Sequence, residues 1–204
     1  MPKLSAATRD RRRNQILDAA RSCIDEHGLE AVSIEMIIAR SGLSTGTVYR
    51  YFDGKDAVVD AAVVAGTREL LERIQPILEL PDPPPPGEFL AQILQAMVAR
   101  AGPGPVDLTR IAVHGWSHSR SRPALAAAIE AELNQVGDRL TSIVRHWQSS
   151  GVLDARADPS AAAELLTTIL LGFLARRALL GASDIDAHAA AFALVAQAQV
   201  VQPT

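Results

Sequence analysis

Residues 33–55 read SIEMIIARSGLSTGTVYRYFDGK. Ser33 and Ser44 each precede a short run with helical spacing, and serine is a residue type that caps the start of a helix. Gly42 lies between the two runs, where it ends the first helix and allows the chain to turn. Two short helices joined by such a turn form a helix-turn-helix, whose second helix enters the major groove of DNA. The segment therefore predicts a helix-turn-helix.

The second predicted helix begins with STGT at residues 44–47, three short hydroxyls around a residue without a side chain. Hydroxyls bond phosphate oxygens or base edges, a glycine lets the backbone come close, and a helix start offers free N–H groups to phosphate. Val48 and Phe52 point inward, which leaves residues 49–50 to face the DNA backbone, and Lys55 presents its ammonium group to the same strand. We predict these DNA-binding residues: Ser33, Ser44, Thr45, Gly46, Thr47, Tyr49, Arg50 and Lys55.

The charge of the chain is unevenly distributed. The net charge is −3, but residues 1–55 carry +2 and residues 56–204 carry −5. Four arginines lie close together near the N-terminus: Arg9, Arg11, Arg12 and Arg13. A mildly basic first part on an acidic remainder is the distribution expected if only the first part meets phosphates.

From Ile37 to Lys55 the sequence resembles the TetR family of one-component bacterial regulators, most specifically in YRYF at residues 49–52 with the lysine that follows. The resemblance implies a three-helix DNA-binding head on a six-helix body that binds a ligand and forms a dimer. It also implies repression that a small inducer relieves. Ile38 departs from the family pattern, which has a small residue here, so we expect a slightly altered packing of the two helices.

Helical spacing extends over the whole chain, and no stretch alternates with period two for long enough to make a strand. We therefore predict an all-α fold of about nine helices, with a DNA-binding domain at residues 1–54 and a ligand-binding and dimerisation domain at residues 55–204. The expected helices are approximately 9–27, 34–41, 45–52, 55–80, 88–101, 106–119, 123–148, 159–181 and 184–200.

The large or polarisable side chains of the second domain are candidates for lining a ligand cavity, although each could equally belong to the core. The predicted pocket residues are Phe89, Met97, His114, Trp116, Trp147 and Phe173. His114 and His118 are four apart, as two metal ligands on a helix would be. No nearby carboxylate or cysteine completes a ligand set, so we predict neither a metal nor a cofactor.

The last two predicted helices are candidates for the dimer interface. Residues 159–181 are apolar on several sides, which is typical of a helix at the centre of a domain or at an interface. Pairing with the same helices of a second copy gives a four-helix interface, whereas the alternative is that both are buried within one subunit. The predicted interface residues are Leu166, Leu170, Phe173, Phe192 and Val195.

The sequence therefore predicts a homodimeric repressor that binds double-stranded operator DNA and an unknown small-molecule effector. A ligand-independent DNA-binding factor and an all-α enzyme are the alternatives. The enzyme has little support, because GWSHS at residues 115–119 lacks the second glycine of a nucleophile elbow. We expect a cytoplasmic location without membrane contact, since the most apolar stretch has only 11 uncharged residues.

Overall fold

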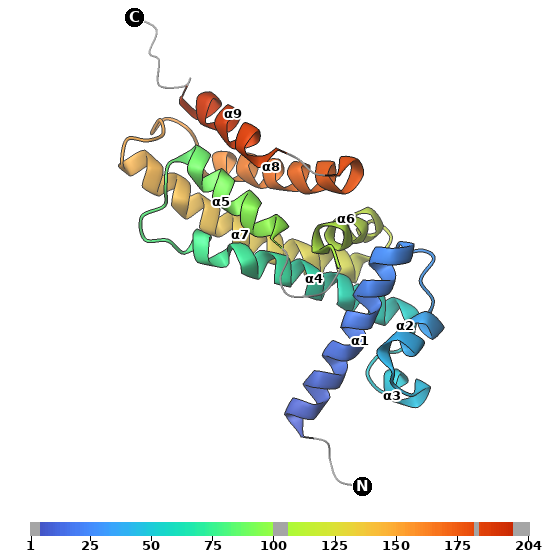
Figure 1. Cartoon of the computed structure of the whole chain (residues 1–204). Coiled ribbons are helices and arrows are strands. Elements are labelled where there is room, and N and C mark those ends of the chain that lie inside the picture. Colours follow the sequence, from blue (N-terminus) through green and yellow to red (C-terminus); the bar gives the residue numbers. More distant parts are fainter. Residues whose placement is uncertain (1–4, 100–105, 182–183, 198–204) are drawn as a thin grey trace, which may run out of the picture. The chain divides into compact units, whose positions relative to one another are not determined.

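The computed structural model describes residues 5–99, 106–181 and 184–197, and within these ranges it contains nine α-helices and no strand (Figure 1). In chain order the helices are α1 (Ala6–His27), α2 (Ile34–Ser41), α3 (Thr45–Tyr49), α4 (Lys55–Leu78), α5 (Pro86–Val98), α6 (Leu108–Ser119), α7 (Pro123–Ser149), α8 (Pro159–Leu180) and α9 (Ile185–Gln197). The prediction of an all-α fold is confirmed. Among the described helices, none combines the length and the apolar composition that crossing a bilayer requires.

Most helix ends lie within a few residues of their predicted positions. α3 is shorter than predicted and ends at Tyr49 rather than at residue 52, because the N–H of Tyr51 donates to the carbonyl of Val48 only three residues back. α5 begins at Pro86 rather than at residue 88, since proline fits the first turn of a helix. The predicted ends of α5 and α9, at residues 101 and 200, lie outside the described residues.

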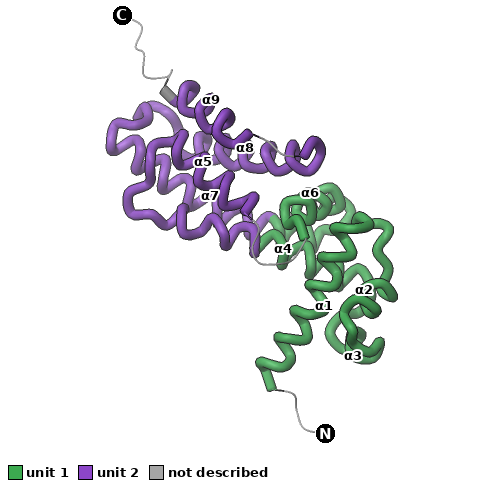
Figure 2. The backbone as a smooth tube through the Cα atoms, in the orientation of Figure 1, with its two compact units in different colours: residues 1–68, 102–129 green, residues 69–101, 130–204 purple. Residues whose placement is uncertain are grey.

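The chain forms two compact units (Figure 2). Unit 1 consists of residues 1–68 and 102–129, and unit 2 of residues 69–101 and 130–204. Unit 1 therefore includes α6 and the beginnings of α4 and α7 in addition to the first three helices. The predicted functional division between residues 54 and 55 is a different division of the chain and stays a prediction.

Unit 1 is built on the apolar stripe of α1. Ile16, Ala20 and Ile24 repeat at four-residue spacing and are fully buried. α6 approaches α4 closely, since a Cβ atom placed on Gly115 would lie 2.1 Å from Cγ1 of Val63. Only glycine permits this contact, so Gly115 sets the separation of the two helices.

Unit 2 has a core of aliphatic side chains around Trp147. The Trp147 ring meets Phe89 edge to face, with 5.2 Å between ring centroids, and its N–H donates to the carbonyl of Pro84 at 3.0 Å. α5 lies against α9, and a Cβ on Gly87 would approach the Cβ of Ala193 to 2.6 Å. Trp147 therefore fastens the proline-rich loop before α5 to α7, while Gly87 allows α9 to cover α5.

Replacing Gly115 with alanine is expected to lower the free energy of unfolding by about 1–3 kcal/mol, because the added methyl group overlaps Val63. Gly137→Ala in α7 is the matched control. A Cβ there meets nothing within 4 Å, so the change should raise stability by up to about 1 kcal/mol through helix propensity. Urea unfolding of both variants measures the difference, and wild-type stability of Gly115→Ala would contradict the close approach.

Candidate nucleic-acid interface

Ser33 caps the start of α2, as predicted from its position. Its backbone is extended, with φ −114° and ψ 161°, and its side-chain oxygen accepts a hydrogen bond from the N–H of Met36 at 3.3 Å. A hydrogen bond with the same side chain lowers the pKa of the Glu35 carboxyl below its usual value. Ser33 is therefore engaged within α2, and its predicted contact with DNA stays a prediction.

The turn between α2 and α3 is held by side chains that the sequence analysis did not identify. Gly42 adopts the left-handed conformation, with φ 65° and ψ 13°, that ends α2. The buried Ser41 hydroxyl donates to the carbonyl of Ile38 at 2.9 Å and accepts from the N–H of Leu43 at 3.2 Å. From α1, the Gln15 amide donates to the Ser41 carbonyl at 2.7 Å. Gln15 and Ser41 together position the turn, and no sequence signal links residues 26 positions apart.

An ion pair also joins the end of α1 to the end of α2. The Arg40 guanidinium binds both carboxylate oxygens of Glu26, at 2.7 and 2.5 Å. The hydrogen bond from Arg40 lowers the pKa of the Glu26 carboxyl. Of the two neighbouring isoleucines in α2, Ile37 is fully buried and Ile38 only half-buried. The predicted effect of Ile38 on the packing of the two helices stays a prediction.

α3 buries one face and exposes the other. Val48 is fully buried and Phe52, just beyond the helix, is 8 % exposed, so both point inward as expected. The hydroxyls of Ser44 and Thr47 lie 2.9 Å apart and hydrogen-bond each other. The remaining predicted contact residues of this segment are exposed: Thr45, Gly46, Tyr49 and Arg50.

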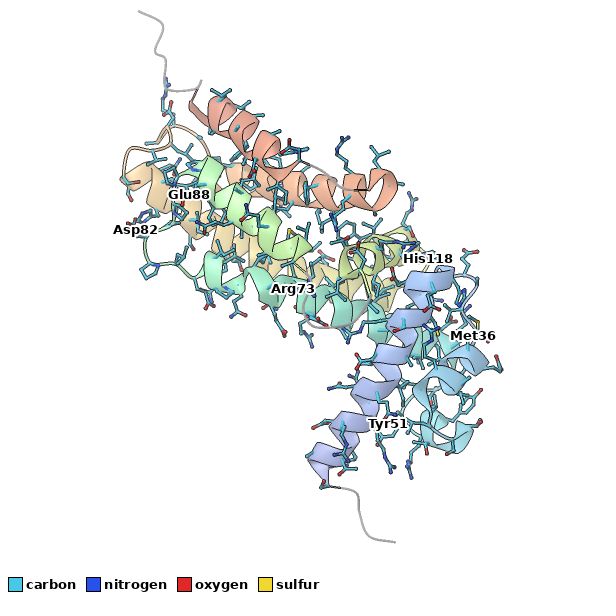
Figure 3. The ribbon with its side chains drawn as sticks, in the orientation of Figure 1. Met36, Tyr51, Arg73, Asp82, Glu88 and His118 are labelled. Atoms are coloured by element: carbon cyan, nitrogen blue, oxygen red, sulfur yellow. The ribbon has the colours of Figure 1, made fainter. Side chains whose placement is uncertain are left out.

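Positive charge lies beside this exposed face. The guanidinium of Arg13 lies over the Phe52 ring, 5.5 Å from its centroid. The half-buried Lys55 donates from Nζ to the carbonyl of Glu30 at 3.0 Å, a contact that sequence reasoning did not foresee. An ammonium group has three N–H bonds, so this contact leaves two donors for another partner. Figure 3 shows the positions of Tyr51, which follows α3, and of Met36 in α2.

Within unit 1, α6 and the residues after it contact the first helices through charged groups. Arg110 lies 3.4 Å from Asp25 in α1, and the His118 ring lies 3.3 Å from the Glu30 carboxylate. Figure 3 accordingly shows His118 at the C-terminal end of α1. Arg122, just before α7, binds both Asp56 and Asp60 of α4. These long-range ion pairs connect α6 to α1 and the start of α7 to α4.

The six residues predicted to line a ligand pocket are divided between the two units. His114 and Trp116 are half-buried on α6 in unit 1. Burial lowers the pKa of the His114 ring below its usual value, and the charge of Arg110 lowers it further. The indole N–H of Trp116 is buried and has no hydrogen-bond partner among the described residues. The other four belong to the core of unit 2: Phe89, Met97, Trp147 and Phe173.

Unit 2 exposes apolar side chains on its last two helices. Of the predicted interface residues, Leu166, Leu170 and Phe173 are buried within the unit, Phe192 is half-buried and Val195 is exposed. The large apolar side chains exposed on α8 and α9 are Leu165, Leu179, Leu180, Leu194 and Val195. The sequence pattern could not distinguish the inner faces of these two helices from their outer faces, and the predicted dimer interface stays a prediction.

The GWSHS segment at residues 115–119 does not have the structure of a nucleophile elbow. Residues 115–119 lie within α6, whereas a nucleophile elbow joins a strand to a helix. The hydroxyl of Ser117 donates to the carbonyl of His114 at 2.8 Å, the ordinary bond of a serine within a helix. Among the described residues, no three His, Cys, Asp or Glu side chains are grouped so as to hold a metal ion.

Two family models match the chain. Residues 16–62 match "Bacterial regulatory proteins, tetR family", and residues 86–199 match "BetI-type transcriptional repressor, C-terminal". The second match covers more than half of the chain and contains α5 to α9.

Known proteins resemble the chain in sequence and in fold. Over 125 residues it is 31 % identical to the HTH-type transcriptional regulator BetI of Paraburkholderia phytofirmans. This match covers 61 % of this chain and 62 % of BetI, so the chain spans less than two thirds of the length of that relative. Over 167 residues it is 29 % identical to the HTH-type transcriptional repressor Rv1474c of Mycobacterium tuberculosis, covering 76 % and 84 %. The crystal structure of a TetR transcription regulator from Haloarcula marismortui superposes with a TM-score of 0.75 at 23 % identity, covering 93 % of this chain and 98 % of that one.

Proposed function

Because the chain belongs to the TetR family of bacterial regulatory proteins, we propose that it is a dimeric transcriptional repressor. It binds double-stranded operator DNA through α2, α3 and the start of α4, and it releases the DNA when a small effector binds. Such a repressor acts in the cytoplasm, where its operator lies.

The observation that carries the proposal is the environment of Gly46. Its φ is not positive, and a Cβ atom added to it would meet nothing within 4 Å. Glycine within a helix costs about 1 kcal/mol relative to alanine, and the protein's own packing offers no compensation for that cost. The absence of a side chain on the exposed face of α3 is an advantage only if another molecule approaches the backbone closely there. The groove of a DNA duplex meets this requirement.

Gly46→Ala is expected to weaken operator binding by at least about tenfold, equivalent to about 1.4 kcal/mol, since the new methyl group occupies the space that the DNA needs. Fluorescence anisotropy with the DNA upstream of its own gene measures the affinity. Thermal stability should stay at or above that of the wild type. Gly137→Ala makes the same change in another open helical position and should bind normally. Unchanged affinity of Gly46→Ala would remove the main support for this DNA-binding surface.

Assembly into a dimer is supported by the outer faces of α8 and α9. Leu179 is 79 % exposed and Leu194 is 69 % exposed, in a protein whose other large apolar side chains are mostly buried. Large apolar side chains exposed in number on two helices are typical of an interaction site. A single recognition helix covers few base pairs, and a two-fold dimer presents two of them in successive major grooves. The proposed function therefore requires the dimer.

Leu194→Glu and Leu165→Glu are expected to convert the dimer to a monomer. Burial of a neutral polar group without a partner costs roughly 2–7 kcal/mol, and burial of an unpaired carboxylate in the interface costs more. Both side chains are exposed in one subunit, so each monomer should still fold. Sedimentation velocity and circular dichroism measure assembly and folding separately. Val152→Glu changes an exposed apolar residue outside the two helices and should leave the dimer intact. Dimers of normal stability from both leucine variants would exclude this surface.

An effector site in α6 is supported by Trp116. A buried N–H group without a partner costs about 1–3 kcal/mol, and a bound molecule with an acceptor would remove that cost. Within unit 1, α6 contacts α1 and the loop before α2, so a change in α6 reaches the DNA-binding helices directly.

An inducer found by thermal-shift screening should bind the free dimer more tightly than the operator-bound dimer. Coupling is reciprocal, so the ratio of the two affinities must equal the factor by which the inducer weakens DNA binding. Two calorimetric titrations, with and without operator DNA, give this ratio. Trp116→Phe, which removes the N–H donor together with the five-membered ring that carries it, should weaken inducer binding and leave DNA binding unchanged. Equal affinities in the two titrations would favour the ligand-independent factor.

A further inference from the structure

The exposed face of α3 offers few side chains that can read a base. The hydroxyls of Ser44 and Thr47 bond each other, and that of Ser33 caps α2. Among the described residues, Thr45, Tyr49 and Arg50 make no hydrogen bond or ion pair through their side chains, and all three are exposed. This inference rests on the proposed DNA binding and concerns these three residues.

The three side chains differ in position and reach. Thr45 and Tyr49 are four residues apart, so they lie on one side of α3, and both are exposed, whereas Val48 is buried. Arg50 follows the last residue of the helix. Tyrosine and arginine at this end have the length to reach phosphates, whereas recognition helices contact base edges with their first residues. Base reading by this face is therefore assigned to Thr45.

Thr45 has two groups that can touch a base, a hydroxyl and the Cγ2 methyl group. Beside it, Gly46 leaves open space where any other residue would have a side chain. The short threonine side chain therefore meets the base edge at close range, where its methyl group packs against the C5-methyl group of thymine. The hydroxyl gives little discrimination, because threonine hydroxyls bond donors and acceptors alike.

We infer that Thr45 is the specificity-determining residue of α3, and that it recognises a thymine through contact between its Cγ2 methyl group and the thymine C5-methyl group. The recognised group is the one chemical feature by which thymine differs from uracil. Each half-site of the operator therefore contains a thymine whose methyl group contributes to the affinity.

The test is a double-mutant cycle, in which the methyl group is removed from the protein, from the DNA, or from both. The bound segment of the DNA upstream of its own gene is synthesised with thymine and with deoxyuridine, and the full-length dimer is titrated with each. Wild type should bind the uracil DNA more weakly by about fourfold for each half-site, the value of one buried methyl group. Thr45→Ser removes only the protein methyl group. This variant should bind thymine DNA as weakly as the wild type binds uracil DNA, and the change to uracil DNA should not weaken its binding further.

Thr45→Val is the matched control, because it keeps a methyl group and removes the hydroxyl. Thr45→Val should still bind uracil DNA more weakly than thymine DNA, as the wild type does. All three proteins should melt at the same temperature, since Thr45 is exposed.

Equal losses on uracil DNA for wild type and Thr45→Ser would overturn the inference, and so would the absence of any loss for wild type. In both cases, tight binding to the thymine segment over a scrambled duplex would leave the proposed function standing. Failure of wild type to prefer the segment over the scrambled duplex would instead reject the proposed function itself.

Discussion

α3 has only five residues, and a helix of one turn is not stable in water by itself. Its position depends on the burial of Val48 against the interior of unit 1 and on the side-chain hydrogen bonds that hold the turn before it. Gln15 and Ser41 supply those bonds from α1 and from the end of α2. The surface proposed to read DNA is therefore a product of tertiary contacts, and α1 acts as its scaffold.

The same unit connects its first three helices to α6 by charge and by shape. The Arg110–Asp25 ion pair links α6 to α1, and the contact between the His118 ring and Glu30 links α6 to the loop before α2. Each contact has one exposed partner, Arg110 or Glu30, so its effect is on the orientation of α6 more than on stability. The contact between Gly115 and Val63 is different, because backbone and side chain meet with no space between them. Val63 therefore resists any movement of α6 toward α4, the helix whose first residue is Lys55.

In unit 2, one helix serves two surfaces. α8 buries Leu166 and Leu170 in the core and exposes Leu165 and Leu179 on its other side. A helix that is apolar on both sides has almost no preference for either, so burial of the outer side depends on a second partner. The proposed dimer supplies that partner, and the DNA-binding and apolar surfaces then belong to one assembled regulator.

Local sequence signals determined the helices and the identity of the helix-turn-helix. Ser33 and Gly42 act on residues within a few positions of themselves, so their effects could be read without a structure. The exposed and buried sides of α3 also followed from spacing, because Val48 and Phe52 lie one turn apart.

Only the tertiary structure decided which side chains are already engaged. The amide of Gln15 and the ammonium of Lys55 bind backbone carbonyls 26 and 25 residues away, and a pattern along the chain carries no information about such pairs. For the same reason the sequence could not say which side of α8 is buried, since leucines occur all round it. Burial is decided by the neighbours that a residue meets after folding, and those neighbours come from distant parts of the chain.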